Sequence, residues 1–200
     1  MVLSPLMAAG FLAAASLASP AGMPQAPPSA LTNAVAVTLH SRAGNAATPM
    51  LERGQEAPDF VYQSHDHLWQ NLHNMLEESH ILLVFGASQT DLAQIERERE
   101  SLRKLGISPV AVVNERDGDA RKTLRQLNLG FSLLADPRGA IGEQYGVRDA
   151  SVAHDRAMWF VIDQDGEIRD RGEGLHPKSG WPTLAMHALD LPPAEITATD

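Results

Sequence analysis

The chain has 200 residues, a formal net charge of −9 at pH 7 and no cysteine. With 44% hydrophobic and 20% charged residues, it has the composition of a globular domain with a sizeable core. The lack of cysteine excludes disulfides, thiol catalysis and cysteine-ligated metal centres. The acidic balance, without a cluster of Lys and Arg, argues against a nucleic-acid or anionic-membrane partner.

The sequence divides into four parts. Residues 1–18 contain an apolar run of signal-peptide length, which is too short to span a bilayer. We therefore expect a cleaved signal peptide and an exported, periplasmic protein. The mature chain is expected to have no membrane span. Because no positive charge precedes this run, the alternative is a cytoplasmic protein with an apolar tail. Residues 19–51 are rich in Pro, Ala, Ser and Thr and predict a flexible linker. Residues 52–191 form the predicted domain, and 192–200 a C-terminal tail.

Strand and helix patterns alternate along the predicted domain. In chain order, we expect an extended segment at 54–62, a helix at 68–77, a strand at 81–85, a helix at 90–105, a strand at 107–113, a helix at 119–127, a strand at 131–134, a helix at 138–145, a strand at 157–162, a strand at 167–171 and a helix at 181–191. The continuous apolar runs are typical of strands buried on both faces. The pair Asp165-Gly166 predicts a hairpin turn between the last two strands. This order indicates an α/β sandwich around a mixed sheet.

Four segments carry a family resemblance: Gly54–Phe60, Ile81–Glu96, Phe131–Val147 and Arg156–Ile168. In this order, they resemble the redoxin branch of the thioredoxin-fold superfamily. The most similar family is the peroxiredoxins of the alkyl hydroperoxide reductase/thiol-specific antioxidant family, and the resemblance covers roughly residues 52–190. It implies a thioredoxin-like three-layer sandwich with a central mixed β-sheet flanked by helices. By analogy with that family, it also implies a homodimer.

The resemblance places the candidate site at the start of the helix after Phe85, and there the sequence departs from the family. On the peroxiredoxin register, Thr90 matches the threonine that hydrogen-bonds the peroxide, Ala93 matches the peroxidatic cysteine and Arg156 matches the arginine that lowers the thiolate pKa. On a second register, Thr90 and Ala93 replace both cysteines of a Cys-x-x-Cys motif. Ala93 replaces a cysteine on either register, and a methyl group cannot act as a nucleophile. Asp91 is interpreted as a charge that complements the helix dipole.

These residues predict a vestigial active-site pocket formed by Thr90, Ala93 and Arg156, with no catalytic residue and no cofactor. The expected function is therefore that of a non-catalytic binding or accessory protein, a pseudoenzyme related to antioxidant redoxins, with a protein or small-molecule partner.

The histidines supply the alternative. His65, His67, His73 and His80 are the only cluster of metal-ligand types, and His73 and His80 share a helix face if the helix continues that far. No recognised ligand spacing is completed, and the sequence assigns no metal site. An antioxidant oxidoreductase activity through a histidine-bound metal remains the second hypothesis.

Overall fold

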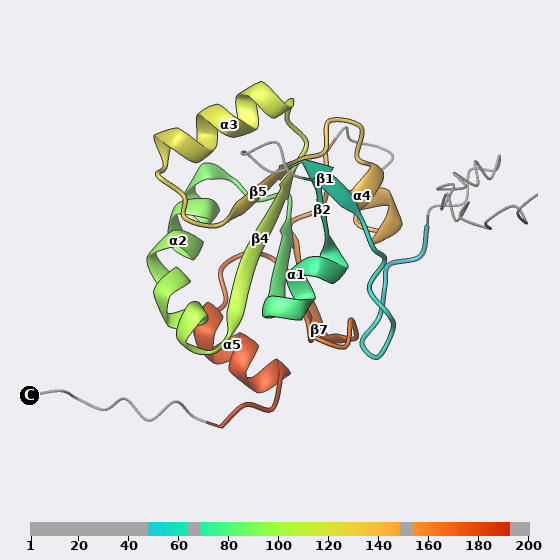
Figure 1. The fold of residues 1–200 in the computed structure, drawn as a ribbon, viewed down its shortest axis with the longest axis vertical. Helices are drawn as coiled ribbons and strands as arrows, with labels where there is room; N and C mark the ends of the chain where they lie inside the picture. Colours follow the sequence, from blue (N-terminus) through green and yellow to red (C-terminus); the bar gives the residue numbers. More distant parts are fainter. Residues whose placement is uncertain (1–47, 64–68, 149–153, 193–200) are drawn as a thin grey trace, which may run out of the picture. The chain divides into compact units, whose positions relative to one another are not determined.

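The computed structural model describes residues 48–63, 69–148 and 154–192. The strands are β1 (Val61–Gln63), β2 (Trp69–Asn71), β3 (His80–Phe85), β4 (Ile107–Val113), β5 (Ser132–Ala135), β6 (Met158–Ile162) and β7 (Ile168–Glu173). The helices are α1 (Leu72–Glu78), α2 (Gln89–Lys104), α3 (Asp117–Gln126), α4 (Ala140–Gln144) and α5 (Trp181–Ala188) (Figure 1). No helix in this described part of the chain has both the length and the apolar character needed to cross a membrane.

Five strands form the central sheet in the order β5-β4-β3-β6-β7. Strands β3, β4 and β5 are parallel, whereas β6 runs antiparallel to β3 and β7 antiparallel to β6. Strands β1 and β2 pair separately as a two-stranded antiparallel sheet. The prediction of a mixed sheet in an α/β sandwich is confirmed.

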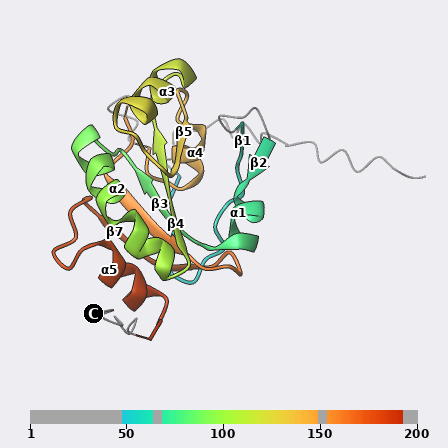
Figure 2. The ribbon, with the colours of Figure 1, turned by 60° about the vertical axis from the view of Figure 1, so that its left-hand side comes forward.

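Strands β3, β4 and β6 contribute side chains to two apolar layers. Ile81, Leu83 and Phe85 of β3 join one buried cluster, and Leu82 and Val84 join the other. This alternation follows from the two-residue period of a strand. The first cluster is covered by α1 and α4, and the second by α2 and α5, which lie on the opposite side of the sheet from α1 and the β1–β2 pair (Figure 2).

The first helix begins later than the sequence predicts. A helix was expected over 68–77, but Trp69–Asn71 pairs with Val61–Gln63, and α1 starts at Leu72. Two side chains fix this start. The Asn71 side-chain oxygen accepts a hydrogen bond from the Asn74 N–H at 2.7 Å, and the Asp59 carboxylate accepts one from the Leu72 N–H at 2.9 Å.

Strand β4 accommodates Pro109 because only β3 borders that part of the strand. The pairing with β5 begins at Val110, whereas the pairing with β3 begins at Ile107. The His80 N–H bonds the Gly106 carbonyl at 3.0 Å, so in this parallel register the odd-numbered residues of β4 direct their backbone groups away from β3. The N–H that proline lacks would therefore face an open edge.

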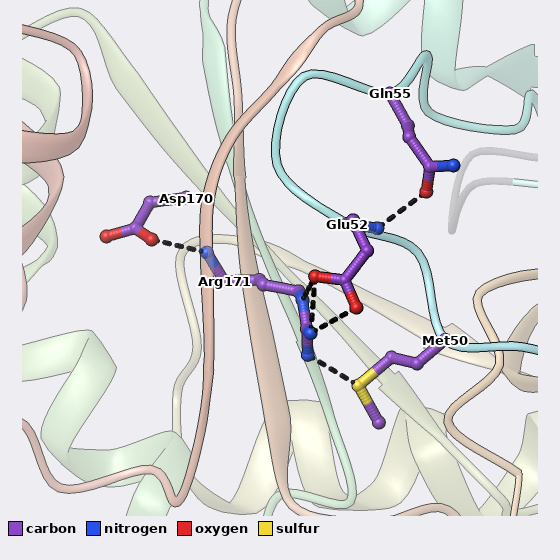
Figure 3. A network of polar contacts seen from close by, with 5 residues as sticks. All are labelled: Met50, Glu52, Gln55, Asp170 and Arg171. Atoms are coloured by element: carbon purple, nitrogen blue, oxygen red, sulfur yellow. Dashed lines mark hydrogen bonds and ion pairs between the residues drawn. The ribbon is translucent and has the colours of Figure 1, made fainter.

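The segment before β1 covers the outer edge of β7. Gly54 and Gln55 exchange backbone hydrogen bonds with Ile168 at 2.8 and 2.9 Å. Farther along β7, the Arg171 guanidinium donates to both oxygens of Glu52, at 2.6 Å each from Nη2, and to the Met50 sulfur at 2.8 Å (Figure 3). The Asp170 carboxylate accepts the Arg171 backbone N–H at 2.9 Å. We call residues 48–57 the N-terminal strap.

Candidate functional site

The candidate site lies at one edge of the sheet. The parallel strands β3, β4 and β5 end there at Phe85, Val113 and Ala135, and β6 begins there because Met158 pairs with Phe85. In open α/β sheets, ligands bind outside the carboxyl ends of the parallel strands. The segments that follow or precede these ends are the turn into α2, the start of the β4–α3 connection, the turn into α4 and the residues before β6.

The N-terminus of α2 is closed by a capping box. Ser88 is the N-cap residue, and its hydroxyl oxygen lies 3.3 Å from the Asp91 N–H that it accepts. In return, Asp91 Oδ2 accepts the Ser88 backbone N–H at 2.7 Å and the Ser88 hydroxyl at 2.6 Å. The interpretation of Asp91 as a charge at the helix start is therefore confirmed, and the structure adds that this carboxylate is buried.

A histidine from a distant loop also contacts the Asp91 carboxylate. His176 Nε2 lies 2.8 Å from Asp91 Oδ1, and His176 Nδ1 lies 3.0 Å from Gln94 Oε1. The Gln94 amide donates to Glu98 at 3.3 Å, and the other Glu98 oxygen accepts the Trp181 N–H at the start of α5 at 2.7 Å. Both ring nitrogens of His176 thus face an oxygen atom.

The three predicted pocket residues lie around this helix start. Thr90 is the second residue of α2 and is exposed, and Ala93, one turn further, is half-buried. Arg156 is exposed and precedes β6. Its backbone is held against the turn before α2: a Cβ at Gly86 would lie 2.7 Å from the Asp155 carbonyl oxygen and 2.8 Å from that of Arg156.

The structure therefore brings the two backbone segments together. It records no hydrogen bond or ion pair between the side chains of Thr90 and Arg156 among the described residues.

The sequence analysis missed a polar cluster at the same edge. The Asp136 carboxylate follows β5 and accepts the N–H groups of Ala140, Ile141 and Gly142 at 2.8, 2.8 and 3.2 Å, which caps α4. The Asn114 side chain follows β4. Its amide donates to the Asp136 carbonyl at 3.2 Å, and its oxygen accepts the Asp155 N–H at 2.8 Å.

Two glycines in the α4 region are the sequence signal for this cluster. A Cβ at Gly142 would overlap the Asp155 carboxylate, and one at Gly139 would overlap the Arg148 guanidinium. Helix interiors disfavour glycine, so Gly142 within α4 indicates that a side chain from elsewhere approaches the helix backbone. Gly139 is the N-cap residue, and its φ of 69° also favours glycine. Arg148 Nη1 lies 3.7 Å from Asp155 Oδ1.

The histidine hypothesis gains no support from the described residues. Helix α1 ends at Glu78, and His80 is the first residue of β3, so the helix does not continue far enough for His73 and His80 to share a helix face. His65 and His67 lie outside the described residues. In the ranges that the structure describes, no three His, Asp or Glu side chains are placed to hold a metal ion.

Taken together, the strand order, the helix starting after β3 and the antiparallel β6–β7 pair define a thioredoxin-like redoxin domain. The AhpC/TSA family model matches residues 53–171, more than half of the chain. The chain belongs to the AhpC/TSA family. The predicted family and the predicted thioredoxin-like fold are confirmed, and the family member described here has no cysteine at all.

Solved structures show the same fold. Peroxidoxin BcpB from Mycobacterium tuberculosis is 17% identical, with a TM-score of 0.63 and coverage of 71% of this chain and 97% of that one. AhpC from Mycobacterium bovis is 14% identical, with a TM-score of 0.60 and coverage of 74% and 98%. A putative thiol:disulfide interchange protein DsbE from Chlorobium tepidum is 23% identical, with a TM-score of 0.56 and coverage of 70% and 96%. No curated protein matches the chain.

Proposed function

We propose that this AhpC/TSA-family protein is a non-catalytic binding or accessory protein. The observation that supports this most directly is the closed N-terminus of α2. In a thiol-dependent redoxin, the helix dipole and the free N–H groups of the first turn stabilise a thiolate. Here the buried carboxylate of Asp91 is the anion at that position, and it is bound by Ser88 and His176.

The two residues at the predicted cysteine positions supply no replacement nucleophile. Ala93 carries only a methyl group, and the Thr90 hydroxyl would need an adjacent base to become reactive. His176 contacts Asp91 and Gln94 through its two ring nitrogens.

The binding surface that we propose is the former active-site pocket of Thr90, Ala93 and Arg156. The exposed Thr90 hydroxyl and the exposed Arg156 guanidinium would recognise a partner with hydrogen-bonding and anionic groups. The partner is a protein or a small molecule, and a second copy of this chain is one form that such a partner can take.

A turnover assay tests the non-catalytic role. Purified protein, before and after removal of bound metal, is mixed with hydrogen peroxide and dithiothreitol, and peroxide is followed over many equivalents. We expect consumption no faster than in buffer beyond the few equivalents that methionine oxidation removes. Sustained turnover only before metal removal would favour the histidine–metal hypothesis, and turnover after it would contradict the proposal.

A second experiment tests the pocket. Retention of partners from native-host extract by immobilised protein is compared between the unmodified chain and Arg156→Ala, with Arg97→Ala as the control for loss of an exposed arginine on α2. We expect a specific partner to be lost with Arg156 alone. Equal retention of the partner by all three proteins would show that the binding surface does not include Arg156.

Export is proposed on the signal-like segment 1–18, which lies outside the described residues. Mature protein from its native host should begin between about Ser19 and Ala30. N-terminal sequencing that finds Met1 or Val2 would contradict cleavage.

A further inference from the structure

Asp155 is an unusual buried acid. Its side chain has 0% exposure, and among the residues that the structure describes it is the only acidic side chain with buried oxygens that accept no hydrogen bond. The other buried aspartates at this edge differ. Asp136 accepts three backbone N–H groups, and Asp91 is bound by Ser88 and His176. A buried carboxylate without hydrogen bonds is costly and calls for an explanation.

The surroundings of Asp155 favour the neutral acid. Two charged groups face it: Asp136 after β5 and Arg148 after α4. Arg148 Nη1 is 3.7 Å away, too far for a hydrogen bond, and is itself buried without a partner. The other neighbours are the uncharged Asn114 side chain and the Gly142 backbone. Burial and then the Asp136 carboxylate raise the pKa of Asp155, and Asn114 and Arg148 offset this only in part.

Asp155 also belongs to the backbone segment that positions Arg156. It forms an antiparallel bridge with Arg148, and the next N–H, that of Arg156, donates to the Val147 carbonyl at 3.0 Å. The carbonyl groups of Asp155 and Arg156 rest directly on Gly86, in the turn that leads into α2. The backbone of Asp155 and Arg156 is therefore held beside the helix start, and the fully buried Asp155 side chain belongs to the same short segment.

We propose that Asp155 is a proton-operated latch: the neutral acid holds residues 155–156 against Gly86 and Val147, and ionisation loosens them. The raised pKa means that folding favours the protonated form. The latch is fully closed below the ordinary Asp pKa of 3.8, and it weakens as the pH rises through the raised pKa of the folded state. The position of Arg156 then depends on pH. This inference concerns the segment itself and stands whether or not the pocket binds a partner.

Amide hydrogen exchange tests the latch. Protection factors of the Asp155 and Arg156 N–H groups are measured from pH 4 to 8, corrected for the intrinsic exchange rate, with core amides of β3 as an internal reference. In the unmodified chain we expect these two amides to lose protection by about tenfold or more, relative to the core, between pH 4 and pH 8. In Asp155→Asn, which is neutral at every pH, protection should stay high.

The control is Asp119→Asn, which makes the same chemical change at an exposed position on α3 and should keep the pH dependence of the unmodified chain. Flat protection in the unmodified chain, or the same loss in Asp155→Asn, would overturn the proposal. If Asp155→Asn does not fold, direct NMR titration of the Asp155 carboxyl in the unmodified protein decides: a pKa at or below 3.8 contradicts the latch, and a raised value supports it.

Discussion

Replacing Asp91 by alanine should lower the unfolding free energy by about 2–3 kcal/mol. The Asp91 carboxylate accepts hydrogen bonds from the Ser88 N–H at 2.7 Å and the Ser88 hydroxyl at 2.6 Å, and it contacts His176 at 2.8 Å. Asp91 is the N3 member of the capping box, and its loss leaves the Ser88 N–H without a side-chain acceptor, which costs about 1 kcal/mol. Loss of the hydrogen bonds to the buried carboxylate adds about 1–2 kcal/mol. The cost is not larger because the Ser88 groups can hydrogen-bond to water in the variant.

The capping-box geometry also predicts non-additivity. Ser88→Ala should cost about 1 kcal/mol by itself. Because Ser88 and Asp91 share the same hydrogen bonds, the double variant should lose at least about 0.5 kcal/mol less than the sum of the single variants.

Urea unfolding followed by circular dichroism measures these values, compared at constant m-value. Glu100→Ala is the matched control on α2. Glu100 is exposed and pairs with Arg103, so the change should stay within about 0.5 kcal/mol. An Asp91→Ala variant as stable as the control, or strictly additive costs, would refute the view that Asp91 is the anion that organises the helix start.

Three further outcomes follow from the structure. Gly142→Ala should lower the unfolding free energy by about 1–3 kcal/mol, seen as a fall in Tm, because the new methyl overlaps the Asp155 carboxylate; a rise in Tm from better helix propensity would contradict that contact. A thiol introduced by Ala93→Cys should titrate near the free value of roughly 8.5, like a Ser101→Cys control, because Asp91 already supplies the anion; a strongly lowered pKa at position 93 alone would show that a thiolate pocket survives. Burial lowers the pKa of His80 below 6.5, against the opposing charges of Asp163 and Asp165, so folding favours the neutral ring. The resulting stability is present above pH 6.5 and is lost as the pH falls below 6.5 through the lowered pKa of the folded state. His80→Leu should therefore reduce the drop in Tm between pH 7.5 and 5, and an unchanged drop would assign it to other groups.

The sheet was predictable because its central strands carry an unambiguous signal. In Ile81–Phe85 every residue is apolar, and every one is buried between two helical layers. The helix over 90–105 was equally clear, and α2 differs from it by one residue at each end. The strand Trp69–Asn71 was missed because its identity depends on pairing with Val61–Gln63, which no local pattern announces.

The candidate site was predictable only in part. The position of Thr90 and Ala93 at a helix start follows from a strand that ends at Phe85. The partner of Asp91 lies 85 positions away at His176, and the sequence gives no sign of that contact. Asp155 likewise stands out only in the structure, where its buried side chain accepts no hydrogen bond. The sequence carries one indication of it, Gly142, against which its side chain packs.

The N-terminal strap has a consequence for how the sheet meets other molecules. An uncovered edge strand is a template for pairing with any other extended chain. Here Gly54 and Gln55 occupy the backbone groups of Ile168, the Asp170 carboxylate occupies the Arg171 N–H, and the ion pair to Glu52 holds the cover in place. A chain shortened to begin at Pro58 would uncover this edge and would also remove Ala57, Met50 and Leu51 from the first apolar cluster, so we expect self-association together with a lower unfolding free energy.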